Sequence, residues 1–406
     1  MTLSPRSRTV LTYGVVLSAG LALVIGISLG TSAPTATASD PALTDATVVA
    51  SLQSGKRAYP AAVQDALRAT RDAPDNLPSA QAAARILISE GRNAGDTRLV
   101  GAALGVLRPF MAKPDAQTLY LAATARQYQH DFTGALVLLD DAIRRDPADI
   151  NALLTRATVQ IVLGRFDLAS ADCDQLYTLS RPDIGFLCQA TNRLLTVDAP
   201  KVYDQLGGIL AQPGALDPSL HNWARGLQGE IAALQGDVAA AQGHLAAVVT
   251  SDPFALRERL LLSDLLLAEG KATQVLDLLK PAIPTDGVLI RRLLAAEAIG
   301  DTATATVGRT ELAQRFKLNI DLGLTAHARE ETLYFLRIAK DPDMALKRAM
   351  VNWNLQHEIE DAQLLVDAAI FADQPKAAVP VVLWMAEQSV VVPSFRMPDA
   401  VREAAK

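Results

Sequence analysis

The amino-acid sequence repeats itself at a fixed period between Asp115 and Ser180, and this period constrains the fold more than any other feature. Three pairs of identical residues lie 34 positions apart, namely Ala123 and Ala157, Phe132 and Phe166, and Ala135 and Ala169. A period of this length accommodates two antiparallel helices with their turns. One such hairpin cannot bury its apolar face alone, so the period predicts a stack of helical hairpins.

The residues inside each copy suit a hairpin that closes tightly. Ala123 and Ala157 are small residues midway along the first helix, where the two helices of a hairpin cross. Gly164 stands where a helix C-terminus commonly takes a left-handed residue. Proline disfavours helix for the residue before it and can open the next helix, so Asp146-Pro147 closes the first copy. This pattern resembles the tetratricopeptide repeat (TPR), and the resemblance implies an all-α fold, an α-solenoid of TPR-like helical hairpins.

The repeat pattern extends over most of the chain. The clearest copies cover residues 115–181 and 222–285, and weaker ones extend the solenoid over 59–390. About nine hairpins are expected in all. A loose C-terminal tail is expected over 391–406, where prolines interrupt the helical pattern.

Glycines at repeat spacing mark the expected turns between paired helices. Gly270 follows Gly236 by 34 residues, and Gly300 follows Gly270 by 30. The predicted turn residues are Gly164, Gly236, Gly270 and Gly300. Between these copies Gly207-Gly208 weakens one unit, which we expect to be degenerate.

Composition agrees with a helical fold and argues against one class of partner. The 406 residues are 50% hydrophobic and only 5% aromatic, so a core would be built from alanine and leucine rather than rings. The formal net charge is −6, without long runs of one sign. A nucleic-acid binder uses a basic field to neutralise phosphates, so no nucleic-acid partner is expected.

The N-terminus carries an export signal. Arg6 and Arg8 precede an uncharged run from Val10 to Gly30, which is 21 residues long. About 20 residues of helix are needed to cross a bilayer. Positive charge before the span places the N-terminus in the cytoplasm and the rest of the chain outside, so an extracytoplasmic, periplasmic location is expected.

The sequence leaves open whether this N-terminal helix is retained. Its length favours an anchor, whereas Ala36-Thr37-Ala38 supplies a small-x-small cleavage site. Residues 1–39 are therefore expected to form either a cleaved signal peptide or a signal-anchor helix. Residues 40–58, rich in alanine, threonine, serine and aspartate, are expected to form a flexible tether.

The two cysteines of the chain lie in neighbouring predicted helices. Cys173 falls in the second helix of the copy that starts at Asp149, and Cys188 falls in the first helix of the next unit. An exported protein matures where disulfides persist, which favours a bridge. Free cysteines also behave as small buried hydrophobes. Both interpretations remain open, and the spacing gives little support to a catalytic role.

The sequence lacks the familiar patterns of enzymes and metal sites. We find no Gly-x-Ser-x-Gly elbow, no His-Glu-x-x-His and no pair of Cys-x-x-Cys knuckles. The local groupings of histidine and carboxylate are His357-Glu358 and His327 with Glu330 and Glu331, which we expect on solvated helix faces. We therefore expect no catalytic residue, no cofactor and no metal. The alternative is an enzyme or metal-handling site in the atypical helices of residues 324–388.

The resemblance to TPR proteins implies a binding surface on the inner face of the superhelix. That face is lined by residues of the first helix of each hairpin. The candidate groove residues are Gln117, Tyr120, Thr124, Gln127, Tyr128, Asn151, Leu154 and Thr158. Their polar and tyrosine character suits an extended peptide or a partner helix. The carboxylate clamp of some family members, built from Lys and Asn, is absent because Tyr120 and Thr124 stand there.

The leading interpretation is a non-enzymatic, exported scaffold that binds another protein. Its expected role is to support the assembly or maturation of an envelope component. A protein or peptide is the expected partner in the groove, and the membrane is a second one if the N-terminal helix is retained.

Overall fold

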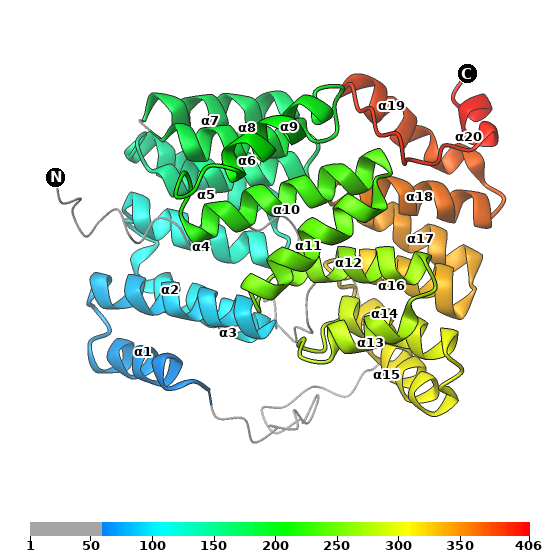
Figure 1. The fold of residues 1–406 in the computed structure, drawn as a ribbon. Helices are drawn as coiled ribbons and strands as arrows, with labels where there is room; N and C mark the ends of the chain where they lie inside the picture. Colours follow the sequence, from blue (N-terminus) through cyan, green and yellow to red (C-terminus); the bar gives the residue numbers. More distant parts are fainter. Residues whose placement is uncertain (1–58, 180) are drawn as a thin grey trace, which may run out of the picture.

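The computed structural model describes residues 59–179 and 181–406, and all regular structure in these ranges is helical (Figure 1). The signal or anchor helix expected over residues 1–39 and the tether expected over 40–58 lie outside the described residues. Within the described ranges, no helix is both long enough and apolar enough to span a membrane.

Consecutive helices pair into hairpins along the chain. The pairs are α2 (Leu77–Ala94) with α3 (Thr97–Leu107), α4 (Ala116–Tyr128) with α5 (Phe132–Arg145), α6 (Ile150–Val162) with α7 (Phe166–Thr178), α8 (Pro182–Arg193) with α9 (Ala199–Leu210), α10 (Pro218–Gln235) with α11 (Val238–Ser251), α12 (Leu256–Ala268) with α13 (Ala272–Leu279), α14 (Asp286–Ala298) with α15 (Thr302–Asp321), α16 (Ala328–Tyr334) with α17 (Pro342–Trp353), and α18 (Ile359–Phe371) with α19 (Val379–Glu387). Helix α1 (Ala61–Asp72) precedes them and α20 (Asp399–Ala404) follows. Short 3₁₀ turns cover Arg108–Phe110 and Pro375–Ala378, and a π-helical turn, Phe335–Ala339, extends α16.

Aspartate starts many of these helices. In each case a side-chain oxygen accepts a hydrogen bond from a backbone N–H of the first turn, which otherwise has no partner within the helix. The capping residues are Asp96, Asp115, Asp131, Asp149, Asp217, Asp237, Asp301 and Asp341. The start of each of these helices is thus determined by a residue at that position in the sequence.

The predicted turn glycines are confirmed by their backbone geometry. Gly164, Gly236, Gly270 and Gly300 have φ angles of 68°, 86°, 74° and 76°. Side chains rarely adopt this left-handed conformation, so glycine allows each first helix to end and the second to begin. Gly207 and Gly208 lie instead inside α9, near its C-terminal end.

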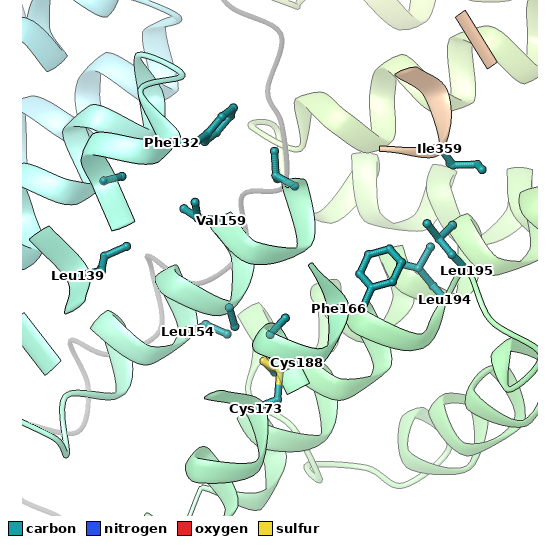
Figure 2. Close-up of a cluster of buried hydrophobic side chains, with 14 of the residues drawn as sticks. Phe132, Leu139, Leu154, Val159, Phe166, Cys173, Cys188, Leu194, Leu195 and Ile359 are labelled. Atoms are coloured by element: carbon teal, nitrogen blue, oxygen red, sulfur yellow. A yellow bond between two sulfur atoms is a disulfide. The ribbon is translucent and has the colours of Figure 1, made fainter. Parts of the chain in front are cut away.

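Small residues let the helices of a hairpin approach closely, as the repeat predicts. The four repeated alanines, Ala123, Ala135, Ala157 and Ala169, are completely buried. Phe132 and Phe166 open the second helices and are also buried. Figure 2 shows this part of the core, where Val159 lies between Phe132 and Phe166, and Leu154 lies near the two cysteines.

The C-terminal part of the chain folds back onto the middle hairpins. The backbone N–H of His357 donates to the carbonyl of Val162 at 2.7 Å, and the N–H of Val391 donates to Leu195 at the same distance. The indole Nε1 of Trp384 lies 3.4 Å from the carbonyl oxygen of Gly164. Repeat periodicity predicts contacts between neighbouring hairpins alone, so this closure was not foreseen. Figure 1 shows α18 and α19 beside the α6–α10 region.

The loose tail expected over residues 391–406 is wrong. Val392 and Val401 are buried, and the N–H of Ser394 donates to the carbonyl of Leu234 at 3.0 Å. The tail also forms α20. The chain after α19 therefore passes the C-terminal end of α10, and α20 then packs against α19 and the Pro375–Ala378 turn.

The hydrophobic core reflects this closure. One continuous cluster joins residues of α1–α10 with residues of the π-helical turn Phe335–Ala339 and of α17–α20. Two smaller clusters hold α11–α14 and α14–α16. The helices α11–α15 therefore form an arc whose two ends are fixed to the same main core.

Candidate functional site

The predicted groove residues divide into two groups in the structure. Tyr120, Thr124, Leu154 and Thr158 are buried. The hydroxyl groups of Thr124 and Thr158 each donate at 2.9 Å to a carbonyl four residues earlier in the same helix. Their hydrogen-bonding capacity is thus used within α4 and α6. Half-buried positions are Gln117, Gln127, Tyr128 and Asn151. Binding by these residues stays a prediction.

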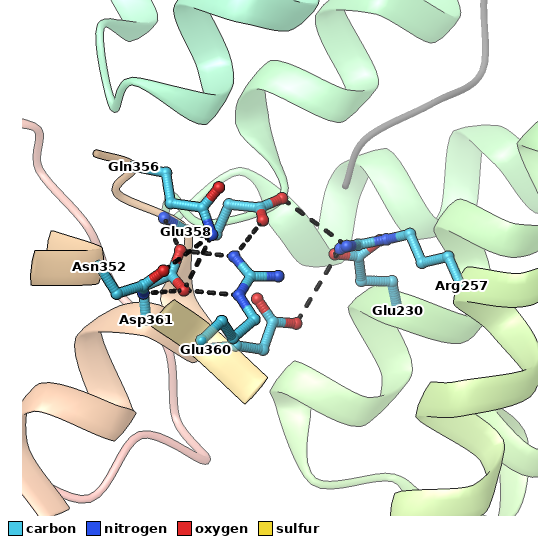
Figure 3. Close-up of polar contacts among 8 residues, drawn as sticks. Glu230, Arg257, Asn352, Gln356, Glu358, Glu360 and Asp361 are labelled. Atoms are coloured by element: carbon cyan, nitrogen blue, oxygen red, sulfur yellow. Dashed lines mark hydrogen bonds and ion pairs between the residues drawn. The ribbon is translucent and has the colours of Figure 1, made fainter. Parts of the chain in front are cut away.

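A cluster of charged side chains lies where the first helices of four hairpins meet (Figure 3). We call it the inner charge cluster, and it consists of Glu230 of α10, Arg257 of α12, Arg329 of α16, and Glu358, Glu360 and Asp361 at the start of α18. Each of these helices is the first of its hairpin. The cluster therefore brings residues far apart in the sequence to one place.

Arg329 is held by the first turn of α18. Its Nε donates to Asp361 Oδ1 at 2.6 Å, its Nη2 donates to Asp361 Oδ2 at 2.5 Å, and Nη2 also pairs with Glu358. Asp361 in turn accepts from the backbone N–H of Glu358 at 3.0 Å, which forms a capping box. Asn352 Nδ2 donates to the same carboxylate at 2.6 Å. Helix capping thus fixes the carboxylate that orients the guanidinium.

Arg257 links α12 directly to α18. Its Nη2 donates to Glu230 Oε1 at 2.5 Å, while Glu358 and Glu360 lie 3.7 and 3.9 Å from the guanidinium. The hairpins α14–α15 and α16–α17 separate these two helices in the sequence. One side chain therefore joins helices that are distant in the sequence.

Burial destabilises the charges of the cluster's carboxylates. It raises the pKa of Glu230 and of Glu360, against the opposing effect of Arg257, and it raises the pKa of Asp361 against Arg329. The side chain of Glu360 is nevertheless 41% exposed. Its carboxyl group is therefore accessible to solvent although protein surrounds it.

His327, Glu330 and Glu331 were expected on a solvated helix face, and this expectation is wrong. All three are buried. His327 Nδ1 lies 3.2 Å from Asp286 Oδ2, and Glu331 Oε2 lies 2.5 Å from Arg348 Nε. The α14–α17 helices therefore bury all three, and they pair His327 and Glu331 with residues that the local sequence could not reveal.

Glu330 lies in the first turn of α16, between Arg329 and Glu331. The residue is only 6% exposed. Burial raises its pKa, although Arg329 and His327 are near enough to oppose the shift. Glu330 thus lies at the edge of the inner charge cluster.

His130 approaches the same region from the turn between α4 and α5. Burial, with Arg329 and His327 nearby, lowers its pKa to about 4, so the ring is neutral at pH 7. Its Nδ1 is buried without a hydrogen-bond partner. A residue of the α4–α5 turn therefore lies near the inner charge cluster.

His357 has aromatic surroundings instead of a catalytic carboxylate. Its ring centroid lies 4.3 Å from that of Trp353 and 6.3 Å from that of Trp384. The ring centroids of the two tryptophans lie 5.5 Å apart. Burial lowers the pKa of His357, so the histidine acts here as a packed ring.

The structure joins Cys173 of α7 to Cys188 of α8 in a disulfide, with their Cα atoms 5.4 Å apart (Figure 2). Both side chains are buried. The bond connects two consecutive hairpins. A buried bridge of this kind has the geometry of a structural link.

No group of three or more His, Cys, Asp or Glu side chains in residues 59–179 and 181–406 has the arrangement to hold a metal ion. The alternative interpretation, a catalytic or metal site in residues 324–388, is not favoured by this geometry. Three carboxylates of that region, Glu331, Glu358 and Asp361, are paired with arginine.

Sequence reasoning missed the inner charge cluster although one signal was present. Glu230 and Arg257 are 27 residues apart, and so are Asp264 and Arg291, whose side chains also pair. An offset of 27 in a 34-residue repeat connects first helices of neighbouring hairpins. An acidic residue and an arginine repeated at this spacing are therefore the pattern to search for.

Comparison with known proteins adds information on the fold alone. No protein-family model matches the chain, and no curated protein does. Among solved structures, a Rap protein complexed with competence and sporulation factor is 15% identical, with a TM-score of 0.47, over 80% of this chain and 92% of that chain. The Cut9-Hcn1 hetero-tetramer of the APC/C is 13% identical, with a TM-score of 0.25, over 85% and 92%. A TPR domain is 14% identical, with a TM-score of 0.22, over 84% and 96%. This chain is similar to them in its succession of helices.

Proposed function

We propose that the protein is a non-enzymatic scaffold that binds a segment of another protein on the inner face of its superhelix. The observation that supports the proposal is the meeting of side chains from the first helices α10, α12, α16 and α18 in the inner charge cluster. Tyr128 and Asn151, on the first helices α4 and α6, are half-buried. Such a surface suits an extended or helical protein segment.

The proposal includes a location outside the cytoplasm and a role in the assembly or maturation of an envelope component. The disulfide between Cys173 and Cys188 supports this location because such bonds persist in oxidising compartments. The arginines and the uncharged run at the N-terminus support it independently. The N-terminal helix then serves as the export signal or as the anchor.

Site-specific photo-crosslinking in living cells tests the binding. A photoreactive residue at Tyr128 or Asn151 is expected to capture a defined protein. The matched control is Arg144 on α5, whose side chain is 70% exposed on a second helix. Capture of the same proteins from Arg144 and from both inner positions, or no capture from either inner position, would contradict the proposal.

A fusion at Lys406 tests the location. A phosphatase that is active only outside the cytoplasm is expected to be active when attached there. Deletion of residues 1–39 is expected to abolish this activity while the fusion protein remains present. Activity that survives the deletion would refute the export signal.

A further inference from the structure

We propose that two copies of this chain associate through the outer face of α15, with the two helices antiparallel and related by a twofold axis. The face is a row of six residues that we call the α15 stripe, and its members are Ala303, Val307, Glu311, Gln314, Leu318 and Leu322. This surface is separate from the inner charge cluster, so the inference goes beyond the proposed function and does not depend on it.

The first argument is the exposure of large apolar side chains along one helix. Val307 is 68% exposed, Leu322 is 53% exposed and Leu318 is 40% exposed. Within residues 59–179 and 181–406, no other helix, taken with its capping residues, carries more than two exposed large hydrophobic side chains. Single exposed apolar residues are normal on a protein surface, whereas a row of them indicates a surface that another molecule covers.

The second argument is that the α15 stripe lies on one side of its helix. Its residues are spaced by four, four, three, four and four positions, and eleven residues make about three helical turns. The buried residues of the helix lie on the other side and are Ala305, Leu312, Phe316 and Asn319. Helix α15 spans 20 residues and lies at an edge of the molecule in Figure 1, so a second copy can approach the stripe.

The third argument is the symmetry of the stripe about its midpoint. Val307 and Leu318 lie equally far from this point along the sequence, and so do Ala303 and Leu322. An antiparallel twofold pair places each residue opposite the one at the same distance on the other side of the midpoint. Val307 of one copy then packs on Leu318 of the other, and the small Ala303 leaves room for Leu322. A twofold interface requires a self-complementary surface of this kind.

The polar centre of the stripe favours the antiparallel orientation. Glu311 and Gln314 also lie equally far from the midpoint, so an antiparallel pair places the amide of Gln314 opposite the carboxylate of Glu311 in the other copy. The amide N–H donates and the carboxylate accepts. The side chain of Glu311 is 43% exposed even though it accepts from Arg315 at 2.7 Å, so it can be reached. A parallel pair would bring the two Glu311 carboxylates together, and like charges repel.

A weak and reversible dimer is expected from the size of this surface. A helix of this length is about 30 Å long, and one pair of such helices buries less than the roughly 1,200 Å² at which standard interfaces begin. The dissociation constant is therefore expected between about 1 μM and 1 mM. Sedimentation equilibrium of the purified full chain should show a monomer–dimer equilibrium over these concentrations.

Introduced cysteines test the orientation. The two native cysteines are joined in a buried disulfide, so a cysteine placed on the surface supplies a free thiol. A chain carrying both Val307→Cys and Leu318→Cys is expected to form disulfide-linked dimers under mild oxidation, whereas each single variant should stay largely monomeric. The two positions are about 16 Å apart along α15, which is too far for a bond within one chain.

Controls of matched geometry lie on other second helices. Ala239→Cys with Thr250→Cys places two exposed cysteines on α11 at the same spacing of eleven residues, and this pair should not cross-link. Val307→Glu puts an unpaired carboxylate against an apolar side chain and is expected to weaken the dimer at least about tenfold. Val137→Glu on α5, where the parent residue is 65% exposed, should leave the equilibrium unchanged. Circular dichroism checks that both glutamate variants remain folded.

Several results would overturn the inference. Equal cross-linking of the α15 and α11 cysteine pairs, or efficient cross-linking of either single α15 variant, would contradict the antiparallel pairing. A chain that stays monomeric over the whole concentration range, or equal effects of Val307→Glu and Val137→Glu, would contradict association through α15. A disulfide from Val307→Cys to a different protein in cells, in place of the dimer, would assign the stripe to that protein instead. The crosslinks at Tyr128 and Asn151 test the proposed function independently of all these outcomes.

Discussion

Replacement of Gly164 by alanine tests whether the folding back of the C-terminal helices stabilises the protein. Gly164 has a φ of +68°, and a Cβ atom added there would lie 2.3 Å from Trp384 Nε1 and 3.0 Å from His357 Cβ. Neither distance can be tolerated without movement of the aromatic side chains. Trp384 is buried against Phe166 and Trp353, so its displacement opens the closure between α19 and the α6–α7 turn.

A matched glycine isolates the contribution of this contact. Gly270 has a φ of +74° and nothing within 4 Å of an added Cβ atom. Gly270→Ala therefore introduces only the left-handed strain, about 1–2 kcal/mol. Gly164→Ala adds the partial loss of Trp384 packing, and complete removal of a buried aromatic side chain destabilises by about 3–5 kcal/mol. We expect Gly164→Ala to lower the free energy of unfolding by about 3–5 kcal/mol in total.

Urea unfolding followed by far-ultraviolet circular dichroism measures both variants. In a Trp384→Ala background the obstacle is gone, so Gly164→Ala is expected there to destabilise no more than Gly270→Ala does. Equal destabilisation by the two alanine variants in the otherwise unchanged chain would refute the view that the closure contributes to stability.

Three further predictions concern single interactions. Replacing Cys173 and Cys188 by alanine should destabilise the protein by about 3 kcal/mol, which is the chain-entropy value for a loop of this length. Hydrogen exchange should then accelerate mainly in α7–α9. Acceleration spread evenly over all helices would contradict a local effect of the disulfide. Arg156→Ala should lower the free energy of unfolding by about 3 kcal/mol because it leaves Asp172, whose side chain is 4% exposed, without its partner. A change below about 1 kcal/mol in urea unfolding would contradict a stabilising role of this ion pair. Burial opposes protonation of His327, but the neighbouring carboxylates outweigh burial and raise the pKa of the ring. The protonated ring therefore stabilises the folded state fully below about pH 6.5, and this stabilisation is lost as pH rises through the raised pKa. The stability difference between the parent and His327→Gln should therefore shrink as pH rises, and a pH-independent difference would argue against the ion pair.

The sequence was sufficient to predict the hairpins because the information that specifies them is local. A helix that begins at Asp149 and ends before Gly164 is determined by a capping side chain and by one left-handed residue. The small residues Ala157 and Ala169 determine how closely the two helices pack. These features recur at the repeat period, so each hairpin could be placed without knowledge of the others.

The closure and the inner charge cluster could not be predicted because they depend on the curvature summed over many hairpins. A small change of rotation per repeat would separate Arg257 from Glu358, or Trp384 from the Gly164 turn. Polarity was also misleading at Glu330. Adjacent charged residues in a sequence predict a solvated helix face, whereas neighbouring helices bury Glu330.

The contacts between the C-terminal helices and the middle hairpins close the succession of hairpins into a ring. The arc α11–α15 is attached at both ends, so a single backbone cut in the Pro281–Thr285 connection would leave two fragments that remain side by side at a high effective concentration. An open solenoid cut at the same place would have only one hairpin interface to hold it together. Formation of the closed ring also requires segments almost 200 residues apart to meet, and such non-local contacts slow folding. The protein is therefore expected to fold more slowly than an open array of equal length, and to survive a cut that would separate such an array.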